Sequence, residues 1–139
     1  MTDMDALASR WWLRIAVLAA IVYAVVGIAF AAFAKFSQMP AAWRLAAWLV
    51  SAATFAVHIG YEHFRLPSSP PREAWHAALA VALGAFALAV WINVHAYWTE
   101  AGHPRPLMLL GLVLFPLVTG APAFLVALAA TAVLARTGR

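Results

Sequence analysis

Four polar side chains recur along one apolar stretch of this sequence, and their types could carry chemistry. They are Ser51, Thr54, His58 and Glu62, at steps of three, four and four residues. That spacing places all four on one face of an α-helix, which we call the polar seam. The rest of the stretch is mostly Ala, Leu, Val, Phe and Ile, which lipid tolerates. We therefore expect the polar seam to face protein and not lipid.

An imidazole and a carboxylate inside a membrane are candidates for moving protons or ions. On this hypothesis the polar seam lines a path for a proton, an ion or a small solute. Glu62, however, lies three residues before Arg65 and could reach outward to pair with it. The sequence leaves both roles of Glu62 open.

Histidines at similar membrane depth indicate a second chemistry, which is cofactor binding. His58 and His76, on consecutive apolar segments, could be the two axial ligands of a b-type haem. His58 and Glu62, at positions i and i+4, could instead chelate a metal ion, with His76 as a third ligand. His58 by itself could also bind the magnesium of a chlorophyll-type pigment. The choice among haem b, a metal ion and a pigment stays open.

An enzyme that acts on lipid would need an acid–base pair near the membrane surface. Glu62, His63, Glu73 and His76 all fall in that region, but their spacing does not favour this use. The chain has no cysteine, which excludes disulfides, thiolate metal sites and a thiol nucleophile. A non-catalytic role is the better prediction.

The composition indicates which elements must position these residues. The chain has 139 residues, of which 66% are hydrophobic and 10% are charged, whereas a soluble domain has about 25% charged residues. Four segments reach the ~20 apolar residues that a bilayer requires, and they cover about residues 12–34, 42–64, 73–98 and 107–134. Short connections that contain proline make consecutive helices antiparallel neighbours. We predict one all-α, integral membrane four-helix bundle with up-down-up-down topology.

Two local patterns refine the prediction. Pro116 and Pro122 each remove a backbone hydrogen bond, so we expect the fourth helix to be kinked there. Small residues also recur along the first helix, where another backbone can approach closely. They are Ala20, Ala24, Gly27 and Ala31. Packing inside the bundle explains this strip better than a dimer interface.

The basic residues indicate the orientation in the membrane. Six of them flank the termini and the middle connection, namely Arg10, Arg14, Arg65, Arg72, Arg136 and Arg139. The other two connections hold three, which are Lys35, Arg44 and Arg105. The positive-inside rule then places both termini in the cytoplasm, and we expect a bacterial-type inner membrane. Because the basic residues are scattered singly, nucleic-acid binding is not indicated.

Tryptophans near the segment ends are expected to anchor the helices at the headgroup region. They are Trp11, Trp12, Trp43, Trp75 and Trp98. Taken together, these features predict a small accessory or structural subunit of a larger membrane complex that is energy-transducing, respiratory or photosynthetic. Its partners would be the lipid bilayer and other membrane subunits or further copies of itself. A haem or metal protein that uses His58 and His76, and a transporter that uses the polar seam, are the alternatives.

Overall fold

The computed structural model describes residues 3–66, 69–99 and 106–137, and helices account for nearly all of them. The helices are α1 (Asp3–Phe36), α2 (Pro40–Arg65), α3 (Pro70–Thr99) and α4 (Pro106–Thr137). No strand occurs within these three ranges. The all-α prediction is confirmed, and all four helices are long and apolar enough to cross a membrane.

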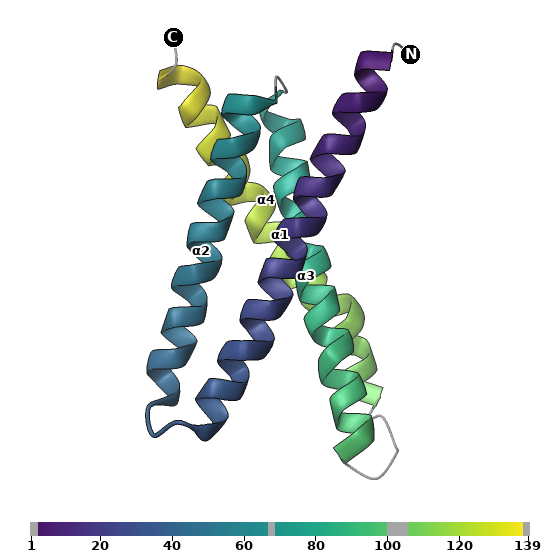
Figure 1. Cartoon of the computed structure of the whole chain (residues 1–139), viewed down its shortest axis with the longest axis vertical. Coiled ribbons are helices and arrows are strands. Elements are labelled where there is room, and N and C mark those ends of the chain that lie inside the picture. Colours follow the sequence, from purple (N-terminus) through teal and green to yellow (C-terminus); the bar gives the residue numbers. More distant parts are fainter. Residues whose placement is uncertain (1–2, 67–68, 100–105, 138–139) are drawn as a thin grey trace.

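The helix ends follow from local sequence. Pro40, Pro70 and Pro106 are the first residues of α2, α3 and α4, where a missing N–H costs nothing. The helix α2 ends at Arg65, and the N–H of the next residue, Leu66, donates to the Glu62 carbonyl at 2.9 Å. Consecutive helices run in opposite directions, so that α1 begins and α4 ends at the same end of the molecule (Figure 1). We call this the termini end, and the opposite one, where α1 and α3 finish, the far end.

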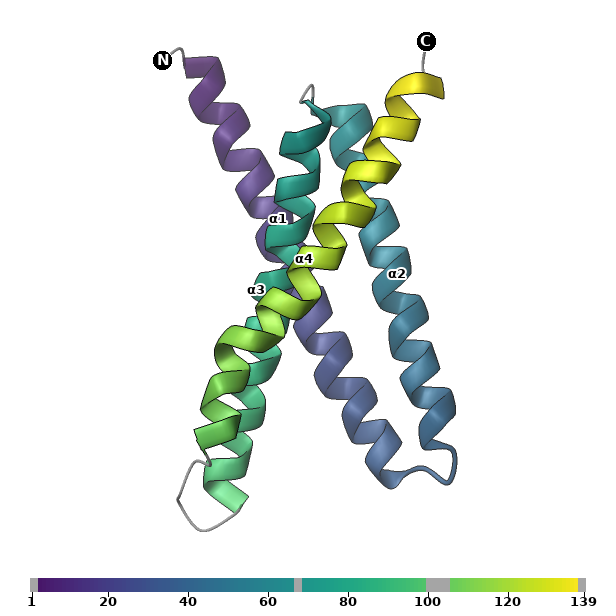
Figure 2. The same cartoon turned by 180° about the vertical axis from the view of Figure 1, so that it is seen from behind.

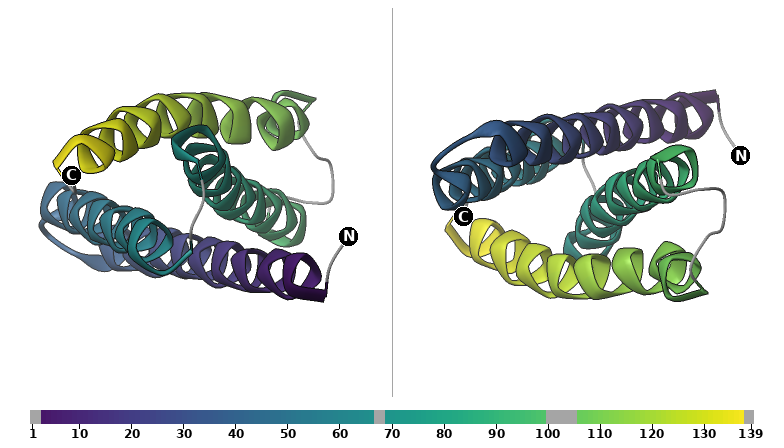
Figure 3. Two further views of the ribbon diagram at one scale, coloured as in Figure 1. Left: turned by 90° about the horizontal axis from the view of Figure 1, so that it is seen from above. Right: turned by 90° about the horizontal axis from the view of Figure 1, so that it is seen from below.

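The helix α3 lies at the centre of the arrangement. It packs against α4 on one side and against α1 on the other, while α2 packs mainly on α1 (Figure 3). Within the described residues the backbones of α1 and α4 do not approach each other, because α3 lies between them (Figure 3). The α1–α2 pair and the α3–α4 pair cross and then diverge toward the far end (Figures 1 and 2). The short connection predicts that α2 and α3 are neighbours, and the side-chain contacts between them lie at the termini end.

The helices meet through small side chains, and large apolar side chains face outward. Five alanines at the helix contacts are at most 1% exposed, namely Ala16, Ala74, Ala77, Ala80 and Ala127. Leu18, Val57 and Val118 are each more than 60% exposed. This distribution is typical of helices that pack closely inside a membrane and present their bulk to lipid. Contact with a lipid bilayer is indicated.

Glycines permit a close approach of α1 and α3. A Cβ placed on Gly84 of α3 would lie 2.6 Å from the Tyr23 Cβ and 3.0 Å from the Ala20 carbonyl oxygen of α1. A Cβ on Gly27 would likewise lie 2.7 Å from a methyl of Leu88. Ala20 and Gly27 belong to the small-residue strip, so at these positions the strip contacts α3, as the within-bundle interpretation predicts.

The fourth helix continues through both of its internal prolines. Residues 106–137 form one unbroken helix, and Thr119 Oγ1 donates to the Phe115 carbonyl at 2.8 Å. No unwound stretch separates Pro116 from Pro122. The kink at Pro116 and Pro122 therefore stays a prediction. The membrane orientation also stays a prediction, and two of the basic residues on which it depends, Arg105 and Arg139, lie outside the described residues.

Candidate functional site

The short connection after α2 brings the end of this helix beside the start of α3. Five titratable side chains then share the termini end, and we call them the polar cluster. They are His58, Glu62 and His63 of α2 and Glu73 and His76 of α3. Glu73 lies in the first turn of α3 and His63 in the last turn of α2. A carboxylate at the start of a helix and an imidazolium at its end would each oppose the partial charge of that helix end.

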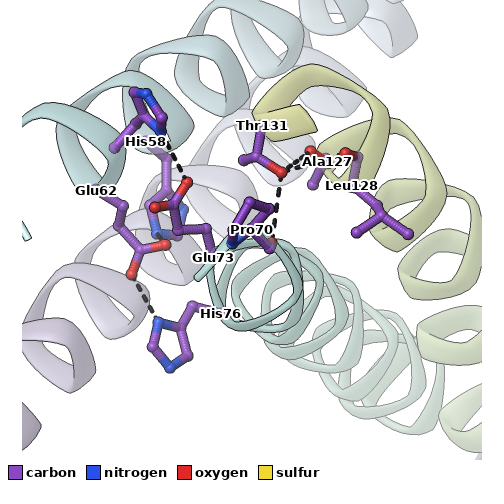
Figure 4. A network of polar contacts seen from close by, with 9 residues as sticks. His58, Glu62, Pro70, Glu73, His76, Ala127, Leu128 and Thr131 are labelled. Carbon is purple, nitrogen blue, oxygen red and sulfur yellow. Dashed lines mark hydrogen bonds and ion pairs between the residues drawn. The ribbon is translucent and has the colours of Figure 1, made fainter. Parts of the chain in front are cut away.

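Glu62 is the centre of the polar cluster. Its side chain points toward α3, where Oε1 lies 2.9 Å from Nδ1 of His76 (Figure 4). Glu62 is 1% exposed and His76 is 8% exposed. This hydrogen bond requires one proton between the two atoms, which either group can carry. The alternative in which Glu62 reaches out to Arg65 is wrong, because the carboxyl group is buried inside the bundle.

His58 lies on the other side of the same carboxyl group. Its Nε2 is 3.9 Å from Glu62 Oε2, which is too long for a hydrogen bond. Within the described part of the chain, neither ring nitrogen of His58 nor Oε2 of Glu62 has a hydrogen-bond partner. Buried polar atoms almost always have one. These three atoms therefore have unused hydrogen-bonding capacity inside the bundle.

His63 and Glu73 form a second pair nearer the surface. Nδ1 of His63 lies 3.2 Å from Oε2 of Glu73. The Glu73 side chain is buried, whereas the His63 side chain is 20% exposed. The polar cluster thus extends from the buried Glu62 to a histidine that solvent at the termini end reaches.

Trp12 completes the site, and sequence reasoning assigned it only an anchoring role. Its indole stacks on the His76 ring, with centroids 4.2 Å apart and planes 3° from parallel. The two residues are far apart in sequence and lie on helices that are not consecutive. Helical periodicity relates residues within one helix only, so no signal in the sequence indicated this contact.

The polar seam is divided into a buried and an uncovered half. His58 and Glu62 are buried, whereas Ser51 and Thr54 are half-exposed. Thr54 Oγ1 donates to the Val50 carbonyl of its own helix at 2.9 Å. Helices of this chain therefore cover the seam at His58 and Glu62 but leave it partly open at Ser51.

The geometry bears differently on the cofactor hypotheses. His58 and His76 do converge, but the Glu62 carboxyl group lies between them, where the iron of a bis-histidine haem would need to be. Among the side chains that the structure describes, no group of three or more His, Cys, Asp or Glu residues is arranged to hold a metal ion. His95 is exposed near the far end of α3 and stacks on Trp91, away from the cluster. Haem, metal and pigment binding stay predictions.

Comparisons of this chain with known protein families, with curated protein sequences and with solved structures found no match. Bundles of helices host many unrelated functions, so this fold by itself assigns none. The chemistry and the burial of the polar cluster are what distinguish one function from another.

Proposed function

We propose that this chain is a small non-catalytic subunit of a larger membrane assembly of the energy-transducing kind, with both termini in the cytoplasm. The observation that carries the proposal is the uncovered half of the polar seam. Ser51 and Thr54 are half-exposed on α2, and toward the far end α3 and α4 diverge from this helix (Figure 1). A polar face of a membrane helix is usually covered by another helix. A helix from another subunit would cover this one.

A photo-crosslinking residue tests where the partner binds. Placed at Ser51, it should form a crosslink to one protein of fixed size in native membranes. The matched control is Val57, which lies on the same helix and is 71% exposed, and a probe there should react with lipid only. Crosslinks to a second copy of this chain at position 51, or lipid adducts alone at both positions, contradict the proposal.

A specific observation favours a second function, in which the polar cluster accepts a proton. Glu62 Oε2 and both ring nitrogens of His58 are buried without a hydrogen-bond partner in the described residues. A proton held between Glu62 and His58 would give Glu62 Oε2 and one ring nitrogen of His58 a hydrogen-bond partner. Such a proton could exchange with solvent through the His63–Glu73 pair. In a proton-translocating assembly this chain would then supply one intramembrane proton site.

Infrared difference spectroscopy across a pH change tests this function. The chain has only five Asp and Glu residues, so the carbonyl band of a protonated carboxyl group can be assigned by substitution. The band should appear in the wild type, be lost in Glu62→Gln and persist in a Glu73→Gln variant. A band that persists in Glu62→Gln contradicts the assignment.

The polar seam does not by itself make a complete path for a transporter. From Ser51 to Glu62 the seam covers 12 residues, and its 11 steps along the helix span about 16 Å of a bilayer core that is about 30 Å thick. Loss of proteoliposome flux in Glu62→Gln would be required to support transport by this chain alone.

A further inference from the structure

A groove lies between α1 and α2 near the far end, away from the polar cluster. Its volume is about 470 Å³, within the ~300–1,000 Å³ that is usual for ligand sites. We call it the basic groove, and it is lined by Gly27, Phe30, Ala31, Ala34, Lys35, Arg44, Ala47 and Trp48. Small side chains hollow its apolar part, and Trp48 forms a wall that is 77% exposed.

Aromatic contacts beside the groove hold the two helices at a fixed spacing. The Trp43 ring of α2 lies 5.0 Å from the Phe33 ring and 5.9 Å from the Phe30 ring of α1, measured between centroids. Such packing joins the helices on one side of the groove. The groove is therefore a feature of the packed helix pair and not of one loose side chain.

Two cations share this groove, and no acidic residue of the described ranges lines it. Lys35 lies in the last turn of α1, and Arg44 is the fifth residue of α2. Lys35 Nζ lies 5.9 Å from the Phe36 ring centroid, and neither Lys35 nor Arg44 forms an ion pair with a residue that the structure describes. The buried carboxylates that the structure describes, Glu62 and Glu73, are both in the polar cluster at the other end. The groove thus combines positive charge at the membrane boundary with an apolar floor that runs into the membrane.

We propose that the basic groove binds one acidic phospholipid, with its phosphate between Lys35 and Arg44 and part of an acyl chain along the small residues. Charge complementarity selects the headgroup, since basic pockets between membrane helices bind anionic lipid headgroups. The apolar part extends from Lys35 to Gly27, which is about 12 Å along α1. A free phosphate ion would use the cations but would leave this apolar part unused.

Native mass spectrometry of the full chain in detergent tests the proposal, with phosphatidylglycerol and phosphatidylcholine as probes. The wild type should retain one phosphatidylglycerol in preference to phosphatidylcholine. A Lys35→Gln/Arg44→Gln double variant should lose about 30-fold in affinity for phosphatidylglycerol, from the usual contribution of a basic residue beside an anionic lipid taken twice. The matched control, Arg14→Gln/Arg136→Gln, removes two exposed cations at the termini end and should bind as the wild type does.

A second variant tests the acyl chain separately from the charge. Ala47→Leu fills the groove, keeps both cations and should lower phosphatidylglycerol retention severalfold. Three results would overturn the proposal. They are equal retention of the two lipids by the wild type, an equal loss in the control double variant, and displacement of phosphatidylglycerol by millimolar inorganic phosphate.

Discussion

The ring of His76 lies flat on the indole of Trp12, at 4.2 Å between centroids, and donates to or accepts from Glu62 through its Nδ1 at 2.9 Å. Through these two contacts a single side chain of α3 joins α1 and α2. At the same end Thr131 of α4 lies 3.4 Å from the Pro70 carbonyl of α3 (Figure 4). All four helices are therefore linked at the termini end, whereas the two helix pairs diverge at the far end.

The stacking of Trp12 on His76 should be measurable as a coupling energy. A double-mutant cycle with Trp12→Leu and His76→Ala should give about 0.5–1.5 kcal/mol, the range for stacked ring pairs. The measurement is reversible unfolding in mixed detergent micelles. The comparison pair is Trp91 and His95, tested with Trp91→Leu and His95→Ala. It is an exposed pair within α3 whose rings stack less closely, with centroids 6.1 Å apart, and its coupling should be smaller. Equal coupling in the two pairs contradicts a specific role for Trp12.

Substitutions at Glu62 should separate hydrogen bonding from burial. Glu62→Leu leaves His76 Nδ1 without a partner, and we expect a loss of about 1–3 kcal/mol in unfolding free energy. Glu62→Gln replaces the carboxyl group by an amide group of the same length, which can still hydrogen-bond to His76. This variant should lose less than half as much unfolding free energy. If both variants were as stable as the wild type, the Glu62–His76 bond would contribute nothing to the fold.

The crossing of α1 and α3 should be sensitive to one methyl group. Gly84→Ala places a Cβ 2.6 Å from the Tyr23 Cβ, and forcing the helices apart should cost about 1–3 kcal/mol. Gly111→Ala is the matched control, because a Cβ there has no neighbour within 4 Å. This control should be neutral or slightly stabilising, since alanine favours helix. The same unfolding measurement compares the two variants. A Gly84→Ala protein as stable as the wild type would contradict the close contact between Gly84 and Tyr23.

The absorption spectrum decides the haem hypothesis. Since the Glu62 carboxyl group lies between His58 and His76, we expect the purified protein to show no Soret band, with or without dithionite. A Soret band in the wild type that disappears in His58→Ala would show that Glu62 moves away and that the two histidines bind a haem iron.

The sequence by itself determined the four helices and the helix face that His58 and Glu62 share. Hydropathy and proline placed all four helices, because helix formation in an apolar segment depends on residues that are neighbours along the chain. The step of four from His58 to Glu62 likewise placed both on one helix face. The short connection to α3 brought His76 within reach.

Only the tertiary structure decided which side chains meet. The stacking of Trp12 on His76, the inward turn of Glu62 and the shared groove of Lys35 and Arg44 each join different helices. The angle at which two helices cross is set by the fit of side chains at the contact, such as Gly84 against Tyr23. That fit is a property of two surfaces together, and no pattern along a single helix contains it.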